Sequence, residues 1–588
     1  MQQLCRILTM LVTAGLGWGQ HTKFIGHFPP ANGDGTVDVI VRYKNHQGGA
    51  ALSRLESHKA KHRRSLESIG SAVTIPATEL ERLAADPDVE SIAPDLPVAA
   101  TDFNGQPDYG WMTVTGISTA RGTLPYDGSG IAVAIIDSGL DEREDLKDSS
   151  GHSRIVYKQS FVPGDNNAAD AYGHGDHVAG VVGGIGKKST GGKFDYWIRG
   201  IATNVKYVNL RVLDKNGSST DSTVIAAIQK AIALKSVYNI RIINLSLGRP
   251  VSTSYGNDPL CQAVQQAWNA GIVVVVAAGN EGRNNSVGTD GYATILSPAN
   301  SPYVITVGAM NTNSTRSRSD DTITSYSSKG PSLIDHIVKP DIVAPGNRII
   351  SLRDSASTLD NAYPQNRVPV YIYSTDTGTS TPDYYQMSGT SAAAPSVSGA
   401  VALMLQKDPG LTPDIVKARL MKTAAKLPLI KTVAVDPVTN VAYISQQDIF
   451  TVGAGYLDVQ AALASTEMPV GNALSPSAAM DRTTGNVYIV GATSAVWGST
   501  AAWGTSAVWG SSAVWGSSAV WGSSGAYGTS AVWGSSAVWG SSAVWGSSAV
   551  WGSSAVWGSS AVWGSSAVWG SSTQVSAEAA RVAIYGDN

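Results

Sequence analysis

Two histidines stand three residues apart in "GHGDHVAG", with an acid between them: His174, Asp176 and His177. Imidazoles at this spacing can share one face of a helical turn, so the pair is compatible with a metal site, a catalytic base or two ordinary residues at a helix start. A metal site needs further His, Glu or Cys ligands, and no recognisable set accompanies the pair. The remainder of the chain has to decide between these interpretations.

Three further polar residues follow apolar or small-residue segments. Asp137 follows "IAVAII", Asn280 follows "VVVVAAG", and Ser391 follows a glycine turn in "MSGTSAAAP". Acyl transfer needs these types: a serine activated by an imidazole, a carboxylate that fixes the tautomer, and donors for the oxyanion. Asp137, His174 and Ser391 can supply the triad, and Asn280 with the N–H of Ser391 the oxyanion donors. Each residue alone fits a turn or a helix cap, but the set favours catalysis.

The segments that must position these residues alternate between two patterns. Short, β-branched, nearly all-apolar runs predict strands buried on both faces, and longer runs between them predict helices. This alternation predicts a parallel sheet with its chemistry at the carboxyl ends of the strands. The predicted strands are 131–137, 205–214, 240–248, 271–280 and 303–309, and the predicted helices include 221–236 and 258–271.

The order of these motifs resembles that of the subtilisin-like serine proteases (subtilases). The matching motifs are "IIDSGLD", "GHGDHVAG", "AAGNEG" and "SGTSAAAP", with "SLG", "KPDIVAPG" and "GAGYLDVQAAL" as further landmarks between 126 and 465. The resemblance implies a secreted endopeptidase that acts on proteins or peptides, with an α/β three-layer fold around a mainly parallel seven-stranded sheet. It also implies that His174 is the general base and His177 a structural neighbour.

The resemblance extends to the substrate cleft, where an extended peptide pairs with two backbone edges. These edges are expected near Gly217 and at Ser246, Leu247 and Gly248, with Leu247 bordering the main specificity pocket. Asp221 stands where the family often has a bulky residue, which predicts a wider and more polar outer subsite.

Asp176 is a departure from the family, which usually has Thr at this position. A carboxylate this close to His174 would favour the protonated imidazole, or it would cap the helix that follows; we favour capping. Ala392 and Ser396 replace larger residues of the family, and both are small enough to pack.

The expected chemistry requires no cofactor, and calcium is a candidate structural ion only. Asp145 lies where the family often has a calcium-ligating Asp. The partner loop, 183–197, lacks an Asn-rich ligand run and carries three lysines, in "GGIGKKSTGGKFDYW". The metal ligands therefore stay unknown.

Composition sets wider limits on the class of protein. The 588 residues are 43% hydrophobic and 15% charged, with a net charge of −3, which predicts several domains and argues against a nucleic-acid surface. The one basic run, 58–64, is interpreted as a solvated helix face. Only Cys5 and Cys261 are present, so a mature chain without residue 5 has no internal disulfide. No segment beyond the N-terminus is apolar enough for a transmembrane helix.

The segment before the predicted peptidase domain divides into two predicted parts. Residues 1–20 are typical of a signal peptide, which predicts secretion. Residues 21–105, with a core at 37–98, resemble the family's inhibitory propeptide and are expected to form a small α+β unit. Its predicted elements are strands at 36–43 and 90–95 and helices at 50–69 and 77–89. The tail around 96–104 is expected to block the cleft, and self-cleavage near 98–110 would free the peptidase domain at 106–465.

The C-terminal part begins with a predicted linker, 466–493, followed by a "SAVWGS" repeat at 494–572 and a tail at 573–588. An even period returns each Trp to one face of an extended chain, which favours a stacked β-solenoid over a disordered Gly/Ser-rich segment. Exposed aromatics would suit surface or polysaccharide contact, so the enzyme would be secreted and surface-associated; a stalk is the alternative. The rival function is a catalytically silent scaffold that binds through the repeats.

Overall fold

The structure is a computed structural model that describes twelve segments of the chain. They are 23–26, 28, 31–44, 55–66, 69–100, 126–285, 289–375, 381–428, 430–436, 440–468, 471–480 and 487–490. The predicted signal peptide, the repeat at 494–572 and the tail at 573–588 lie outside these residues. Among the described residues, no helix is both long enough and apolar enough to cross a membrane.

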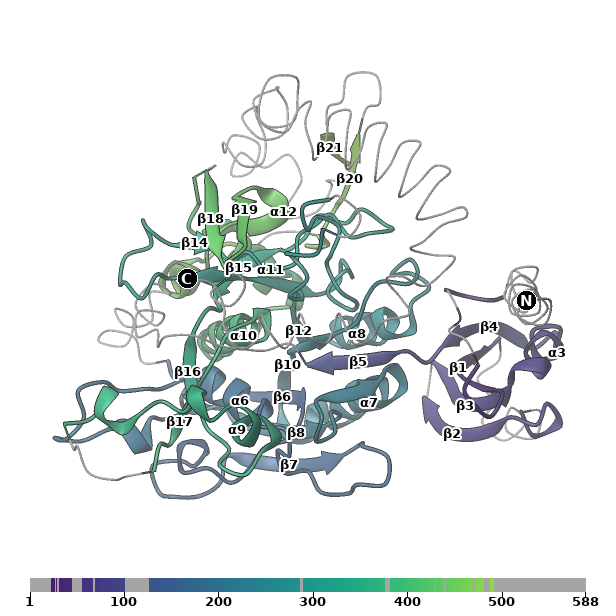
Figure 1. The fold of residues 1–588 in the computed structure, drawn as a ribbon, viewed down its shortest axis with the longest axis horizontal. Coiled ribbons are helices and arrows are strands. Elements are labelled where there is room, and N and C mark those ends of the chain that lie inside the picture. The colour runs from purple at the N-terminus through teal and green to yellow at the C-terminus, as the bar shows by residue number, and fades with distance from the viewer. Residues whose placement is uncertain are drawn as a thin grey trace, which may run out of the picture.

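An eight-stranded sheet forms the centre of the larger domain (Figure 1). All of its strands run parallel except β14, which pairs antiparallel with β13. Buried apolar runs form most of these strands, because both sheet faces are covered. The mainly parallel sheet expected from the sequence is thereby confirmed, but the number of strands was wrong: there are eight and not seven, because the short antiparallel strand β14 extends the sheet at one edge. Its strands are, in spatial order, β14 (Thr322–Ile323), β13 (Ile305–Asn311), β12 (Val273–Ala277), β10 (Ile240–Leu245), β6 (Ala132–Asp137), β8 (Lys206–Arg211) and β7 (Ile155–Ser160), with β15 (Ile342–Pro345) beside β13.

Helices cover both faces of the sheet and make three layers. Alternate residues of β6 enter two different apolar clusters: Val133 and Ile135 pack on one side, and Ala134 and Ile136 on the other. The first cluster contains α6 (Gly175–Gly183), α10 (Thr390–Lys407), α11 (Pro413–Thr423) and α13 (Val459–Ala464). The second contains α7 (Asp221–Tyr238) and α8 (Pro259–Asn269). The predicted helices at 221–236 and 258–271 correspond to α7 and α8.

Over its described residues, the N-terminal unit is a four-stranded antiparallel sheet with a short helix, and residues 55–57 are also helical. Its strands are β1 (Thr36–Tyr43), β2 (Lys61–Leu66), β3 (Gly70–Pro76) and β4 (Val89–Pro94), in the order β2-β3-β1-β4, and its helix is α3 (Leu80–Ala84). The predicted helix at 50–69 is wrong over its second half, because residues 61–66 form the edge strand β2. The basic run is therefore on a sheet edge, where charged side chains are well tolerated, and not on a helix face.

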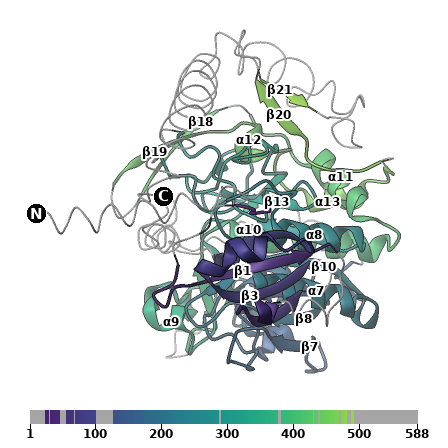
Figure 2. The same ribbon diagram turned by 90° about the vertical axis from the view of Figure 1, so that its right-hand side faces the viewer.

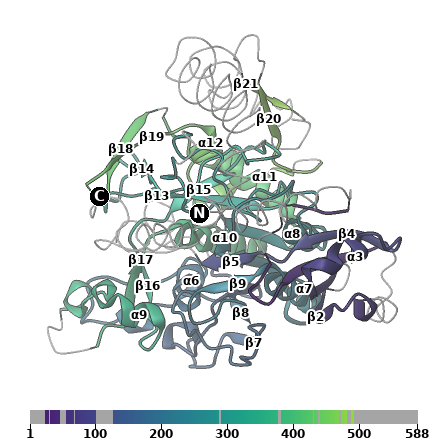
Figure 3. The ribbon, with the colours of Figure 1, turned by 45° about the vertical axis from the view of Figure 1, so that its right-hand side comes forward.

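This N-terminal unit packs against α7 and α8 of the larger domain. Ile40, Leu66 and Ala72 belong to the same apolar cluster as these two helices. Polar bonds cross the boundary as well, since Gln229 of α7 donates to the carbonyl of Leu66 at 2.5 Å. From this unit the chain runs as β5 (Pro97–Ala100) directly into the larger domain, as Figures 1 and 3 show.

Part of the predicted linker is integrated into the larger domain. Ala473 and Ser475 are buried, and Ala478 donates its N–H to the carbonyl of His336. Residues Ser477–Met480 (β20) then pair with Val487–Val490 (β21). Figure 2 shows this hairpin at the same end of the domain as the hairpin of β18 (Lys431–Val435) and β19 (Ala442–Gln446).

The remaining elements of the larger domain are β9 (Ser218–Thr220), β11 (Leu247–Gly248), β16 (Ile349–Leu352), β17 (Tyr384–Met387), α9 (Thr358–Ala362) and α12 (Ile449–Val452).

Candidate active site

Asp137 and His174 form a buried hydrogen-bonded pair at the carboxyl edge of the sheet. Asp137 is the last residue of β6, and His174 directly precedes α6. The imidazole Nδ1 lies 2.6 Å from the carboxylate Oδ1 of Asp137, and both side chains are buried. When Nδ1–H donates a hydrogen bond to this carboxylate, the proton of the neutral imidazole is on Nδ1. Nε2 is then unprotonated and can act as a base.

Asp170 braces the two loops that carry this pair, and the sequence analysis missed it. Its carboxylate accepts the Ser138 hydroxyl at 2.7 Å, the N–H of Gly173 at 2.7 Å and the N–H of Asp176 at 2.8 Å. Ser138 follows Asp137 and also accepts the N–H of Gly175 at 2.9 Å. Burial raises the pKa of Asp170 to about 7, although these donors oppose the shift. The sequence feature that could have indicated Asp170 is its place four residues before His174, in "DAYGH".

Ser391 is the second residue of α10, which packs against α6 on the same face of the sheet. Its own carbonyl would normally accept the N–H four residues on, but that residue is Pro395, which has none. The Ser246 hydroxyl supplies the missing donor at 2.9 Å, and it accepts in turn from the Asn244 side chain. Ser246 is also predicted to lie on a substrate-binding backbone edge; its side chain fixes the backbone of Ser391.

Hydrogen bonds from Thr390 fix the side chain of Asn280, the residue expected to donate to the oxyanion. It follows β12 and is buried. Its Oδ1 accepts the N–H of Thr390 at 2.9 Å and the hydroxyl of Thr390 at 3.0 Å. The Nδ2 group is also buried and donates no hydrogen bond to any described residue. Thr390, which the sequence analysis missed, thus orients Asn280. The sequence feature that could have indicated Thr390 is its place directly before Ser391.

His177 is a buried structural histidine on α6. Its Nε2 lies 3.0 Å from the carbonyl of Ile349, in β16. Burial lowers its pKa to about 3, so the ring is neutral at ordinary pH. Its burial and its bond to a backbone carbonyl agree with the structural role that the resemblance implies.

Asp176 does not cap α6, so the favoured interpretation of this residue was wrong. Its carboxylate accepts from the Arg143 guanidinium at 2.6 Å and from the N–H of Asp141 at 2.8 Å. Burial raises the pKa of Asp176 well above its usual value, and the cation of Arg143 opposes this shift. The capping role passes to Asp170 and Ser138, which accept the first N–H groups of the helix.

An extended segment of this same chain lies between the two expected substrate edges. Strand β5 pairs antiparallel with β9 on one side and with β11 on the other. Leu247 and Gly248 lie opposite Ala100 and Ala99, as expected for a substrate-binding edge. Gly217 is in the turn before β9, so the opposite edge consists of residues 218–220 and not of Gly217 itself.

Asp221 does not make a polar outer subsite, contrary to the sequence prediction. Its side chain is fully buried, and both of its carboxylate oxygens bond the Arg249 guanidinium. The sequence gives no sign of this partner, because the two residues are 28 positions apart.

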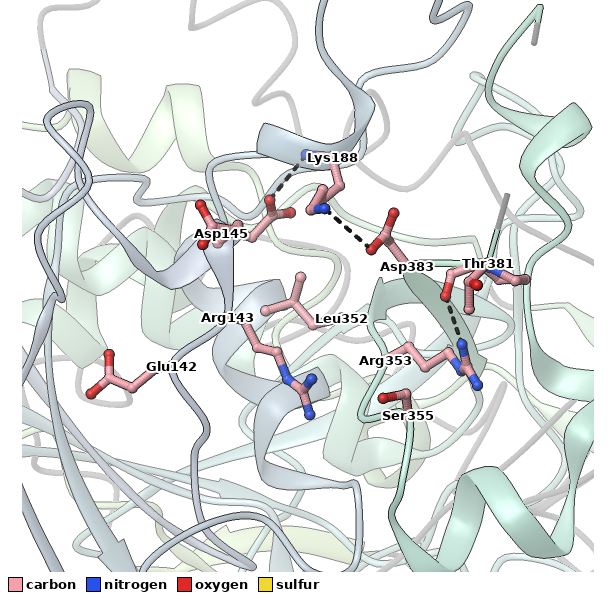
Figure 4. Close-up of a pocket in the computed structure, with 11 residues that line it drawn as sticks. Glu142, Arg143, Asp145, Lys188, Leu352, Arg353, Ser355, Thr381 and Asp383 are labelled. Atoms are coloured by element: carbon pink, nitrogen blue, oxygen red, sulfur yellow. Dashed lines mark hydrogen bonds and ion pairs between the residues drawn. The ribbon is translucent and has the colours of Figure 1, made fainter. Parts of the chain in front are cut away.

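The residues around Asp145 do not fit calcium. Its carboxylate is already bonded by the N–H of Lys188 at 3.2 Å and by the hydroxyl of Tyr384 at 3.0 Å. Burial raises the pKa of Asp145 to about 6, although its hydrogen-bond donors oppose the shift. Figure 4 shows the adjoining pocket of about 290 Å³, where Lys188 reaches toward Asp383. The two groups bonded to the Asp145 carboxylate are thus hydrogen-bond donors, whereas a calcium ion binds oxygen acceptors.

A second acidic cluster is already neutralised by an arginine. Carboxylate oxygens of Asp141, Asp176 and Asp354 lie within 4.8 Å of one another. Arg143 contacts all three, at 3.1, 2.6 and 2.6 Å respectively. Its guanidinium therefore supplies the positive charge that a metal ion would bring.

Comparison with known proteins agrees with this geometry. A family model described as the subtilase family matches residues 128–453. The chain is 39% identical over 303 residues to serine protease AprX of Bacillus subtilis (strain 168), a match that covers 50% of this chain and 61% of AprX. It is 35% identical over 303 residues to subtilisin DY of Bacillus licheniformis, covering 51% of this chain and 86% of that protein.

A solved structure shows a similar fold. Fervidolysin from Fervidobacterium pennivorans, a keratinolytic enzyme related to subtilisin, superposes with a TM-score of 0.55 at 21% identity. That match covers 77% of this chain and 64% of fervidolysin. The family model spans more than half of the 588 residues, and the relatives and the Asp137–His174 pair agree with it. The chain therefore belongs to the subtilase family of serine-type endopeptidases.

Proposed function

We propose that this protein is a secreted endopeptidase that cleaves peptide bonds of proteins through Asp137, His174 and Ser391. In this proposal His174 Nε2 takes the proton of the Ser391 hydroxyl as the oxygen attacks the substrate carbonyl. Asp137 stabilises the imidazolium that forms. His174 then protonates the leaving amine, and a water molecule, activated by the same base, hydrolyses the acyl-enzyme.

The oxyanion of each tetrahedral intermediate would be bound by two donors. One is the Asn280 amide, whose orientation is set by Thr390. The other is the N–H of Ser391, at the start of α10, where N–H groups have no acceptor in a preceding turn. No step in this scheme requires a metal ion or an organic cofactor.

The observation that carries the proposal is the 2.6 Å bond between His174 and Asp137. A buried carboxylate on Nδ1 selects the one tautomer that can accept a proton at Nε2. The Asn280 amide beside the start of α10 adds an oxyanion donor, which a silent scaffold would not need.

The N-terminal unit would act as an intramolecular inhibitor that self-cleavage removes. Its strand β5 occupies both substrate edges at once, so a protein substrate cannot pair with either edge while it is bound. The Asp95 carboxylate also caps α7, since it accepts the N–H of Ser222 at 2.8 Å. Release of this unit after cleavage beyond Ala100 would open the cleft.

Secretion and surface attachment are the parts of the proposal that rest on sequence alone. The apolar segment within 1–20 is typical of an export signal, and the tryptophans of 494–572 would suit contact with a surface or a polysaccharide.

The test compares the wild type with Ser391→Ala and Ser396→Ala, all expressed from residue 21. Ser396 is a matched control, because it is a buried serine of the same helix whose hydroxyl bonds no described residue. We expect the wild type and Ser396→Ala to lose the N-terminal unit and digest casein. Ser391→Ala should keep its full length and be inert.

Wild type that neither matures nor digests casein would contradict the proposal and favour a binding scaffold. Casein digestion by Ser391→Ala at the wild-type rate would instead show that another residue is the nucleophile.

A further inference from the structure

A buried ion pair joins the two walls of the substrate cleft. Arg249 directly follows β11, and Asp221 directly follows β9, so one member belongs to each wall. The guanidinium Nε lies 2.8 and 3.0 Å from the two carboxylate oxygens of Asp221, and Nη2 lies 2.8 Å from one of them. The side chains are 3% and 0% exposed, so the pair links the two walls through the protein interior.

The register of β5 places this pair at the upstream end of the cleft. Asp221 donates its N–H to the carbonyl of Leu96 at 2.8 Å. On the other wall Gly248 pairs with Ala99, so continuation of the antiparallel register places Arg249 beside Val98. The ion pair therefore crosses the cleft where the chain passes from Leu96 to Val98.

Further bonds hold the pair in place. Arg249 Nη2 also lies 2.8 Å from Asp258, the N-cap residue of α8, and Asp258 accepts the Ser297 hydroxyl at 2.8 Å. The N–H and carbonyl of Arg249 both bond the backbone of Ser297. Moving the guanidinium aside would leave buried carboxylates without a counter-charge, which is costly. A bulky substrate side chain cannot readily displace this group.

We propose that the Arg249–Asp221 pair is a specificity device that fills the upstream end of the cleft and restricts the substrate residue lying across it to a small side chain. The inference rests on the proposed endopeptidase function. The segment that occupies the cleft here, "PVAA", contains only small residues. Because this segment extends at least to Ala100, the restricted position is the third residue or further upstream of the cleaved bond.

The test uses peptide pools in which one upstream position at a time is Ala or Phe, with mass spectrometry to locate the cleaved bond. The wild type should prefer Ala at one position, at or beyond the third. In the variant Arg249→Gly with Asp221→Ala, which empties the space, kcat/KM for Phe relative to Ala should rise there by about tenfold or more. The preferences at the other positions should stay unchanged.

Two further variants separate the space-filling role from a structural one. Arg249→Met with Asp221→Leu and Asp258→Asn removes the charges but keeps the volume, and apolar replacement of a buried pair is usually tolerated. It should keep the wild-type preference for Ala. Arg283→Gly with Asp436→Ala removes an equally buried pair, 2.6 Å apart, that belongs to neither wall, and it should also keep that preference.

Each outcome has a definite meaning. If the emptied variant cleaves peptides with an unchanged Phe/Ala ratio, or if the volume-matched variant shifts the ratio equally, the specificity role is wrong while the endopeptidase function stands. If the emptied variant does not fold, the volume-matched variant still decides, because loss of its preference for Ala would overturn the inference. If the wild type cleaves no peptide, the proposed function itself fails and this inference with it.

Discussion

The Ser246 hydroxyl bonds the carbonyl of Ser391 at 2.9 Å and so replaces the helical hydrogen bond that Pro395 cannot make. The proline is the sixth residue of α10, beyond the first turn in which a missing N–H costs nothing. Ser246 therefore links the end of β10 to the residue proposed as nucleophile. It is a positioning residue, since no reacting atom needs to touch it.

Substituting Ser246→Ala should lower kcat more than it changes KM. The substitution leaves the buried carbonyl of Ser391 without this donor, at a cost of about 1–3 kcal/mol. Relaxation of the helix start would displace the nucleophile, and we expect kcat to fall roughly tenfold. Steady-state kinetics on a chromogenic peptide would measure both constants. Ser396→Ala is the matched control: it removes a buried hydroxyl of α10 that bonds no described residue. Equal kcat values for both variants would contradict a positioning role.

His177 should make the fold sensitive to acid. Its pKa is about 3 in the folded protein, below the ordinary value of 6.5, so the unfolded chain binds its proton more readily. The stability from this residue is complete above pH 6.5 and is lost as the pH falls toward 3, by up to roughly 1.4 kcal/mol per pH unit. Urea unfolding of His177→Gln, in the inactive Ser391→Ala background, should show a flatter pH dependence between 3 and 6.5. The substitution His152→Gln, at an exposed histidine, should leave the slope as it is. A slope unchanged in His177→Gln would show that other groups govern acid unfolding.

The guanidinium of Arg143 should take the place of a bound metal ion beside α6. Its replacement in Arg143→Met leaves Asp141, Asp176 and Asp354 without their shared partner, and we expect a loss of about 3 kcal/mol in stability. Millimolar calcium should then raise the melting temperature of Arg143→Met more than that of the wild type. Arg143→Lys keeps a positive charge and should lose less stability. Identical calcium responses of Arg143→Met and wild type would contradict this account.

Much of the fold was predictable because its strands are buried on both faces. Runs such as 131–137 and 271–280 are apolar throughout, which is typical of a parallel sheet, and their ends carry Asp137 and Asn280. The edge strand β2 was not predictable in this way. It has one covered face and five partly or fully exposed residues, "KHRRS", so its pattern resembles a solvated helix.

The contacts that position the site were less predictable than the site itself. Asp176 contacts Arg143, 33 residues away, and Ser246 contacts Ser391, 145 residues away. Such pairs depend on how strands and helices are placed in space, and local propensity carries no trace of them. A motif can thus indicate which side chains react, whereas the partners that orient them require the tertiary structure.

We expect the peptidase domain to need residues as far as Ser475 for its stability. Its hydroxyl donates to Asp341 at 2.6 Å and accepts from the ammonium of Lys417 at 2.8 Å, in a fully buried cluster. Ser475→Ala should lower stability by about 1–3 kcal/mol, as measured by urea unfolding. A chain ending at residue 490 should unfold like the full-length protein, whereas one ending at 470 should be strongly destabilised. Equal stability of the two truncated chains would show that residues 471–490 contribute nothing to stability.

The measurement that tests the central claim most directly is labelling of the matured protein with a fluorophosphonate, followed by mass spectrometry of its peptides. The account predicts one added probe, on Ser391, in the wild type and in Ser396→Ala. Labelling should be absent in Ser391→Ala and slower by a factor on the order of 10⁶ in His174→Ala, because the hydroxyl then lacks its base. Labelling of a different residue, or an equal labelling rate in His174→Ala and wild type, would contradict the Asp137–His174–Ser391 mechanism.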